Sequence, residues 1–186
     1  MAEAKKEGKT KLVTAVELAA LPDAALYELV DGELIEMSPT KVTHGRFEHQ
    51  FSRLLGNFVA EHDLGEVMVG EIGMFIRRNP DTIRAADVLF ISKERFAQAS
   101  DDSYLDVPPE LVVEVLSPSE SWGMVRRKLR DYFEMGVTVV IIIDTDHQVL
   151  TLFRSPTELT ELQATDTLSL PDILPGFALP LAKLFT

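Results

Sequence analysis

Two strongly apolar segments that enclose one amphipathic segment constrain the fold of this chain more than any other feature. Residues 110–116 (ELVVEVL) and 137–144 (VTVVIIID) are rich in Val, Ile and Leu, as central strands are. The segment between them predicts a helix over 120–135, which the Ser-Pro-Ser string at 117–119 can cap and Gly136 ends. A helix of this length suits the right-handed crossover between two parallel strands.

The remaining patterns predict shorter strands and two more helices. Asp31-Gly32 lies between the two alternating halves of YELVDGELIEM (27–37), which is typical of a β-hairpin. Thr14, followed by Glu17, predicts the capped start of a helix over 14–21. We expect a long helix at 43–62 and strands at 66–70, 72–77, 84–91, 149–154 and 159–163. We expect a loop from the end of the 84–91 strand to the Pro108-Pro109 pair, and loop with a short helix at 170–186. The sequence therefore predicts an α/β fold with a mixed β-sheet flanked by helices.

Length and composition narrow the class of protein. The chain has 186 residues, so we expect one domain over 12–186 behind a flexible tail at 1–11. It has no cysteine, which excludes disulfides and thiolate sites and favours a cytoplasmic location. No apolar run is long enough to span a membrane, and the polar N-terminus lacks the apolar stretch of a secretory signal. We therefore expect no membrane partner.

The net charge of −12 argues against a protein that coats nucleic acid by bulk electrostatics. It leaves room for an enzyme that holds nucleic acid through metal ions and one local basic strip. Residues 122–130 form such a strip, with four basic residues and no acid, whereas residues 155–180 hold four acids and no Lys or Arg.

Two acids interrupt the apolar strand patterns. Glu114 lies within ELVVEVL, where an uncompensated polar group costs roughly 2–7 kcal/mol and a charge costs more. Asp87 shares a strand face with Leu89 and Ile91 in RAADVLFI. Each acid also has a purely structural interpretation. Glu114 can reach solvent or pair with an arginine at a strand end, and Asp87 can lie at the rim of the sheet.

The predicted helix over 120–135 carries a lysine at the border of its buried stripe. We expect that stripe to comprise Trp122, Val125, Leu129, Phe133 and Gly136. Lys128 lies about 100° from Leu129 around the helix, and Tyr132, one turn further on, shares the same border. The alternative is a solvated basic face, which is the favoured interpretation for Arg126, Arg127 and Arg130.

Two carboxylates on neighbouring strands form a hard-oxygen site suited to Mg²⁺ or Mn²⁺. Such a metal lowers the pKa of a bound water and stabilises the charge that develops on a phosphate. A neighbouring lysine can orient the water or neutralise the developing charge. Asp87, Glu114 and Lys128 are therefore the residue types that metal-assisted phosphodiester hydrolysis requires.

At these residues the chain resembles the PD-(D/E)XK nuclease superfamily, and more closely the Uma family of restriction endonucleases, which are prokaryotic proteins. The resemblance runs from Thr14 to Phe185. It is carried by YELVDGELIEMSP, an early helix with His44, RAADVLFI, PPELVVEVLSPSE, and KLRDYFEMGV before the apolar strand that ends at Asp144.

The resemblance implies a restriction-endonuclease-like fold and assigns roles to single residues. Asp87 would be the motif aspartate and Glu114 the second metal ligand, with the backbone carbonyl of Val115 contributing. The usual superfamily lysine position, two residues after the acid, is Leu116 here. Lys128 would take that role from the following helix, with Tyr132 beside it.

Further residues follow from the same resemblance. Glu71 would add a carboxylate from the preceding strand. His44 and Glu48, one helical turn apart, either line the cleft or form an ordinary helix-face pair, and the second interpretation is favoured. Ala86 replaces the motif proline, which changes backbone stiffness, and the segment before Asp144 lacks the tryptophan that relatives often place there.

Three functions remain open from the sequence. The first is a Mg²⁺- or Mn²⁺-dependent endonuclease acting on DNA, with a homodimer expected by analogy because cutting two strands needs two sites. The second is a nuclease fold used as a binding or regulatory module with little or no catalysis, which the acidic charge favours. The third is a partner-binding domain with incidental acids. No helix-turn-helix or zinc finger identifies a preferred nucleic acid sequence.

Overall fold

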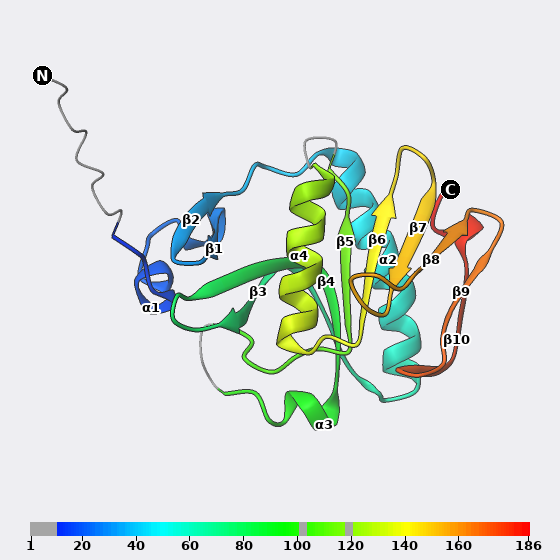
Figure 1. The fold of residues 1–186 in the computed structure, drawn as a ribbon. Coiled ribbons are helices and arrows are strands. Elements are labelled where there is room, and N and C mark those ends of the chain that lie inside the picture. The colour runs from blue at the N-terminus through cyan, green and yellow to red at the C-terminus, as the bar shows by residue number, and fades with distance from the viewer. Residues whose placement is uncertain (1–10, 101–103, 118–120) are drawn as a thin grey trace, which may run out of the picture.

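The computed structural model describes residues 11–100, 104–117 and 121–186. Its centre is a mixed sheet in the order β2-β1-β4-β5-β6-β7-β8, with β3 also paired to β4 (Figure 1). The strands of this sheet are β1 Tyr27–Val30, β2 Glu33–Glu36, β3 Gly65–Arg77, β4 Thr82–Ser92, β5 Leu111–Val115, β6 Val139–Asp144, β7 Val149–Phe153 and β8 Leu159–Gln163. The predicted α/β fold with a mixed sheet flanked by helices is confirmed.

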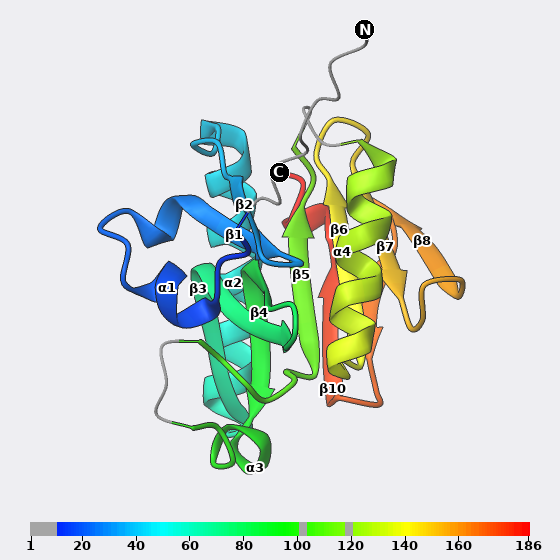
Figure 2. The same cartoon turned by 60° about the vertical axis from the view of Figure 1, so that its left-hand side comes forward.

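Helices cover both faces of the sheet (Figures 1 and 2). The helices are α1 Ala15–Ala19, α2 Val42–Glu61, α3 Lys93–Phe96 and α4 Trp122–Met135, with 3-10 turns at η1 Ala24–Leu26 and η2 Leu181–Lys183. Each face of the sheet has its own hydrophobic core. Alternate residues of β5 belong to one core or the other, because the side chains of a strand alternate between the two faces. Val113 packs with α2 in one core, and Val112 packs with α4 in the other.

The central strand-helix-strand prediction is confirmed. β5 and β6 pair in parallel, with Glu114 opposite Ile142, and α4 makes the connection between them. Gly136 ends α4 in the left-handed region, at φ 104°. The predicted helix start at 120 and the cap at 117–119 lie largely outside the described residues; the described helix has Ser121 as its N-cap.

The N-terminal predictions are also confirmed where the structure describes them. Thr14 and Glu17 form a reciprocal capping box at α1. Asp31 and Gly32 both have positive φ, 52° and 81°, as a two-residue hairpin turn between β1 and β2 requires. The predicted tail at 1–11 lies outside the described residues except for Lys11, which pairs with Glu17.

Three local predictions are wrong. The strands expected at 66–70 and 72–77 are one strand, β3, with a register shift between Val69 and Ile72. The loop expected after 92 opens with the four-residue helix α3, which Ser92 caps. The loop expected from 170 contains a second, two-stranded sheet of β9 Thr167–Leu170 and β10 Leu174–Pro180, followed by the short helix η2.

The prolines explain the last of these errors. Pro171 lies in the turn between β9 and β10, Pro175 lies at the register shift in β10, and Pro180 ends that strand. All three are positions where a missing N–H does little harm to a sheet. They favoured a loop in the sequence although the hairpin packs Leu168 and Leu174 into the core beside α2.

The buried face of α4 differs from the predicted stripe. Trp122 is 56% exposed and Phe133 is only partly buried, whereas Asp131 and Tyr132 are buried. The helix is therefore rotated toward its polar border, because charged partners on β1 and β4 receive Asp131 and Lys128. The spacing of apolar residues along a helix gives no information about charged partners on other strands, so it could not predict this rotation.

A gap in the sheet positions the functional residues. Val88 pairs with Val69 of β3 and with Val113 of β5, so those strands lie on opposite edges of β4. Ile83 pairs with Phe75 of β3 and with Leu29 of β1, so β1 lies on the same edge as β5. Residues 84–87 of β4 therefore lie between the stretches that pair with β1 and with β5, and we call this interruption of strand pairing the sheet gap.

Candidate active site

Asp87 lies at the end of the sheet gap where β4 and β5 diverge. The described β4–β5 register ends at Val88 and Val113, so Asp87 and Glu114 are the two residues that would pair next. Instead, the backbone N–H of Val115 donates a 2.7 Å hydrogen bond to Oδ2 of Asp87. The side chain thereby replaces a ladder hydrogen bond, and its buried carboxylate is fixed at the C-terminal end of β5.

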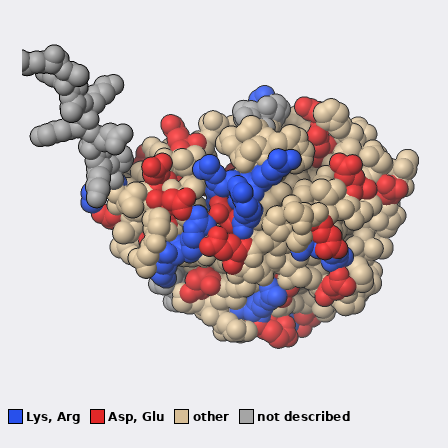
Figure 3. Space-filling view, viewed as in Figure 1, with Lys and Arg blue, Asp and Glu red and all other residues tan. Residues whose placement is uncertain are grey.

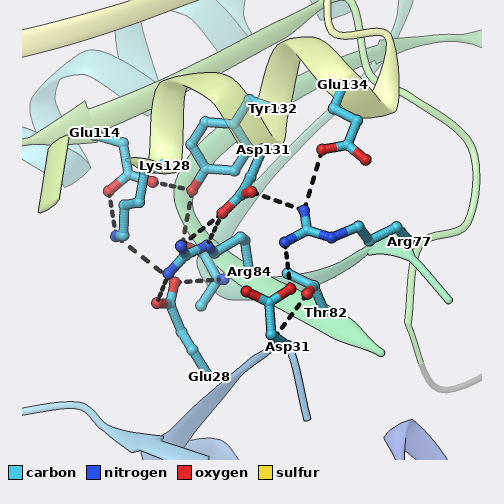
Figure 4. A network of polar contacts seen from close by, with 11 residues as sticks. Glu28, Asp31, Arg77, Thr82, Arg84, Glu114, Lys128, Asp131, Tyr132 and Glu134 are labelled. Atoms are coloured by element: carbon cyan, nitrogen blue, oxygen red, sulfur yellow. Dashed lines mark hydrogen bonds and ion pairs between the residues drawn. The ribbon is translucent and has the colours of Figure 1, made fainter. Parts of the chain in front are cut away.

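Glu114 is held by two residues of α4 (Figure 4). Its Oε2 accepts a 2.9 Å hydrogen bond from Nζ of Lys128, and its Oε1 accepts one from the hydroxyl of Tyr132. Lys128 and Tyr132 are one helical turn apart, so both reach the same carboxylate. The sequence placed this pair at the border of the buried stripe; Lys128 is partly buried as expected, but Tyr132 is fully buried, and the two share Glu114 as their target.

Burial, with a smaller contribution from the charge of Asp87, raises the pKa of Glu114 to about 8 against the opposing effects of Lys128 and the Tyr132 hydroxyl. The phenol of Tyr132 is also buried, and burial beside Glu114 raises its pKa well above the ordinary value. Tyr132 lies 3.2 Å from the carbonyl oxygen of Ala85 as well. Since one hydroxyl has one hydrogen, it can donate to only one of these two acceptors at a time.

The first turns of α2 face Asp87 from the other side. Nε2 of His44 lies 3.1 Å from Oδ2 of Asp87, and the His44 side chain is 12% exposed. Burial lowers the pKa of His44, but the contact with Asp87 and the charges of Glu48 and Glu71 together outweigh it and leave the pKa raised. The favoured interpretation of His44 and Glu48 as an ordinary helix-face pair does not describe this position, because His44 contacts a buried carboxylate.

A strained bulge in β3 adds a further carboxylate. Val69 pairs with Val88 and Ile72 with Ala86, so Gly70 and Glu71 together stand opposite Asp87. Glu71 has a φ of 60°, a conformation that residues with a Cβ rarely adopt. Burial and then the charge of Asp87 raise the pKa of Glu71. The same two causes raise the pKa of Glu48, which accepts a 3.2 Å hydrogen bond from Gly70 N–H.

The structure thus brings Asp87, Glu114, Lys128 and Tyr132 together in one site, with Glu71 close enough for its charge to interact with that of Asp87. Val115 contacts Asp87 through its N–H group; the metal contact expected of its carbonyl stays a prediction. A pocket opens between β5 and α4 and is lined by Glu114, Leu116, Lys128 and Tyr132 among others.

Sequence reasoning missed the charged residues that border this site. Glu28 of β1, Arg84 of β4 and Asp131 of α4 are each buried and linked to one another by ion pairs. Glu28 and Arg84 lie within apolar strand segments, where a charged residue was an available signal, as it was for Glu114. Asp131 lies off the predicted apolar stripe of its helix, and no local pattern marks it.

The donor atoms of the site fit a divalent cation in kind, because carboxylate oxygens are the ligands that Mg²⁺ and Mn²⁺ prefer. The raised pKa values of Glu114, Glu48 and Glu71 reflect several acids sharing a poorly hydrated space. Within the described residues, no three His, Asp or Glu side chains are gathered in a ready coordination geometry. Glu114 and Asp87 are paired with Lys128 and His44 instead.

The outer face of α4 is basic (Figure 3). Arg126, Arg127 and Arg130 are exposed, and none of them has an ion pair or hydrogen bond to a residue that the structure describes. One helix therefore carries Lys128 toward the site and three arginines toward solvent. No helix among the described residues has the length and apolar character to cross a membrane.

Comparisons with known proteins identify the fold and the family of this chain. The structure is similar to the crystal structure of a protein from Anabaena variabilis, described as a "putative nuclease belonging to DUF820". The TM-score is 0.79 at 17% sequence identity, over 93% of this chain and 97% of that one, which is a likeness of fold. No protein with a curated description matches the chain. The sequence model of the Uma2 family, described as "putative restriction endonuclease", matches residues 15–182, so the chain belongs to that family.

Proposed function

We propose that this protein is a metal-dependent nuclease that hydrolyses phosphodiester bonds of DNA. The observation that carries the proposal is the meeting of Asp87 and Glu114 at the point where β4 and β5 diverge, with Lys128 in contact with Glu114. Family membership supports nuclease activity, and the metal and the substrate are our inference from the chemistry of these side chains.

Asp87 and Glu114 would hold Mg²⁺ or Mn²⁺, with the carbonyl of Val115 and the carboxylate of Glu71 as further oxygen ligands. Such an ion supplies an acidified water and neutralises the charge that develops on phosphate. Asp87 contacts His44 and Glu114 contacts Lys128, so a bound cation would compete with each of these partners for its carboxylate.

Lys128 and Tyr132 have distinct roles in this proposal. Lys128 orients the attacking water and stabilises negative charge, because its ammonium is a compact cation with three donors. Tyr132 is buried and fixes the Glu114 carboxylate, so it controls where that ligand points. Both residues depend on the placement of α4 against the sheet gap.

DNA is the proposed substrate because a basic face adjoins the site in a strongly acidic protein. Arg126, Arg127 and Arg130 are available for phosphate contacts, whereas a net charge of −12 disfavours binding elsewhere on the surface. A homodimer would supply the two sites that a double-strand cut requires. We place the protein in the cytoplasm, since it contains no cysteine.

A nuclease fold used as a binding or regulatory module is the second candidate. The contacts of Glu114 and Asp87 with Lys128 and His44 favour it, since both carboxylates are satisfied without a metal. Under this alternative the protein would bind nucleic acid on the α4 face and leave it intact.

The deciding experiment is incubation of the protein with plasmid DNA, single-stranded DNA and RNA, each with Mg²⁺, Mn²⁺ or a chelator. Asp87→Ala and Lys128→Ala are assayed in parallel, with Glu134→Gln on the exposed end of α4 as the control. The nuclease proposal is supported if the wild type and the control variant cut in a metal-dependent way and both site variants do not cut. Measurable metal and nucleic acid binding without cutting on any substrate moves the assignment to the binding module.

A further inference from the structure

Glu28 is a buried carboxylate on the opposite side of Lys128 from Glu114. Its Oε1 lies 3.7 Å from Nζ of Lys128, and Glu114 Oε2 lies 2.9 Å from the same nitrogen (Figure 4). The two acids come from different strands, β1 and β5, on either side of the sheet gap. The lysine ammonium therefore lies between two carboxylates.

Glu28 is itself fixed in place by two hydrogen bonds to β4. Oε1 accepts a 3.0 Å bond from the backbone N–H of Ala85, and Oε2 accepts a 2.7 Å bond from Nη1 of Arg84. Arg84 is only 5% exposed, and its other partner is Asp131 of α4. A buried carboxylate with these contacts has little freedom to turn, so its position relative to Lys128 is set by the β4 backbone.

We propose that Glu28 is the positioning residue for Lys128: it holds the ammonium at the sheet gap, beside the carboxylates that meet there. That Glu28 holds Lys128 in place rests on the contacts alone. That this matters for cleavage rests on the proposed function. A long, flexible side chain on a helix is oriented more closely when one of its anchors is itself rigidly held, as Glu28 is. When a cation or substrate draws Glu114 away, Glu28 keeps Lys128 in place.

Asp131 provides a matched control. Both Glu28 and Asp131 are buried acids that pair with Arg84, so Glu28→Gln and Asp131→Asn each remove one charge from the same guanidinium. Among the described contacts, Glu28 has an ion pair with Lys128 and Asp131 pairs with arginines. A general loss of stability should affect both variants, whereas a loss of lysine positioning should affect Glu28→Gln much more than Asp131→Asn.

The first readout does not depend on nuclease activity. Reductive methylation with formaldehyde and a borohydride, followed by peptide mass spectrometry, measures how fast Lys128 is modified relative to the other lysines. We expect Glu28→Gln to raise the Lys128 rate several-fold, because the nitrogen spends more time in solvent, and Asp131→Asn, which keeps the Glu28–Lys128 pair, to raise it much less. An unchanged rate in Glu28→Gln, or an equal rise in Asp131→Asn, would overturn the proposal.

The second readout is the steady-state kinetics of cleavage. Glu28→Gln should lower kcat by about 10- to 100-fold, as a displaced catalytic group does, while KM stays within about two-fold. Asp131→Asn should lower kcat much less than Glu28→Gln does. If Glu28→Gln fails to fold, Glu28→Asp keeps the pairing charge for Arg84 while withdrawing the carboxylate from Lys128, and the same two results are expected.

The two readouts separate the two ideas. If the wild type cuts no substrate but Glu28→Gln selectively exposes Lys128, the positioning stands and the nuclease proposal fails. If the wild type cuts and Glu28→Gln changes neither the Lys128 modification rate nor kcat, the positioning proposal fails and the nuclease stands.

Discussion

Asp87 and Glu114 occupy the two positions that would continue the β4–β5 ladder beyond Val88 and Val113. Their strands separate there, and the Asp87 side chain takes the hydrogen bond of Val115 that a neighbouring strand would otherwise have received. The site is therefore built from an interruption of backbone pairing. Each acid is buried, yet each has polar partners, which is why the fold tolerates them.

Without metal, the stability of the protein should fall as pH rises from about 4.5 to about 8. Burial raises the pKa of Glu114 to about 8, and burial also raises the pKa values of Glu48 and Glu71. An acid with a raised folded pKa contributes stability that is complete below its unfolded pKa and is lost as pH rises through the folded value. Urea unfolding at several pH values measures this loss.

Glu114→Gln is the test of that prediction. The variant should remove a pH-dependent part of stability on the order of a few kcal/mol, because it cannot ionise. Mg²⁺ should stabilise the wild type increasingly as pH rises toward 8 and should stabilise the variant much less. A wild type and variant with parallel pH profiles would contradict the assignment of this ionisation to Glu114.

Tyr132→Phe should weaken both stability and activity. The change removes the hydroxyl that contacts Glu114 and lies 3.2 Å from the Ala85 carbonyl, and it leaves a buried acceptor without its donor. We expect a loss of about 1–3 kcal/mol in the free energy of unfolding. Thermal unfolding and cleavage rates check this, with Phe133→Leu on the partly buried side of α4 as a packing control. If the Tyr132→Phe variant is as stable and as active as the wild type, the Tyr132 hydroxyl has no role in the site.

Glu71→Gly and Glu71→Ala should differ in stability but not in function. Glycine relieves the positive φ of 60°, whereas alanine keeps that strain, so the glycine variant should be more stable than the alanine variant by about 1–2 kcal/mol. Both lack the carboxylate and should bind Mg²⁺ more weakly than wild type by calorimetry. Wild-type metal affinity in both variants would exclude Glu71 from the metal site.

Replacing Arg126, Arg127 and Arg130 by Gln should weaken DNA binding without abolishing the chemistry. Each lost phosphate contact should reduce the slope of log affinity against log salt by about 0.9 for duplex DNA. The slope is measured by titration at several salt concentrations with Ca²⁺ in place of Mg²⁺. The control is Arg154→Gln. Arg154 directly follows β7 and pairs with Asp172. An unchanged slope in the triple variant would place the DNA on another face.

The sequence predicted the parts of the fold that local patterns determine. The crossover from β5 to β6, the Asp31-Gly32 hairpin and the Thr14 capping box each depend on residues close together in the chain, and each is confirmed. Glu114 was detectable for a related reason. A lone acid inside ELVVEVL conflicts with its apolar neighbours, and that conflict is visible without a structure.

What the sequence could not supply were contacts between distant segments. The sheet gap follows from β1 and β5 sharing one edge of β4, and no local pattern encodes that arrangement. The rotation of α4 that buries Asp131 and exposes Trp122 depends on Arg84, 47 positions earlier in the chain. His44 was set aside for the same reason, because its significance is its contact with Asp87.

Glu28, Arg84 and Asp131 also constrain how this protein can change over evolutionary time. Arg84 is the buried cation that both acids face, so replacing it alone leaves two interior carboxylates with one partner fewer each, and breaking a buried ion pair costs about 3–5 kcal/mol. A lineage can lose the trio together or keep it together, and intermediates are disfavoured. The three positions should therefore be inherited as a block, even where the surrounding apolar residues drift freely.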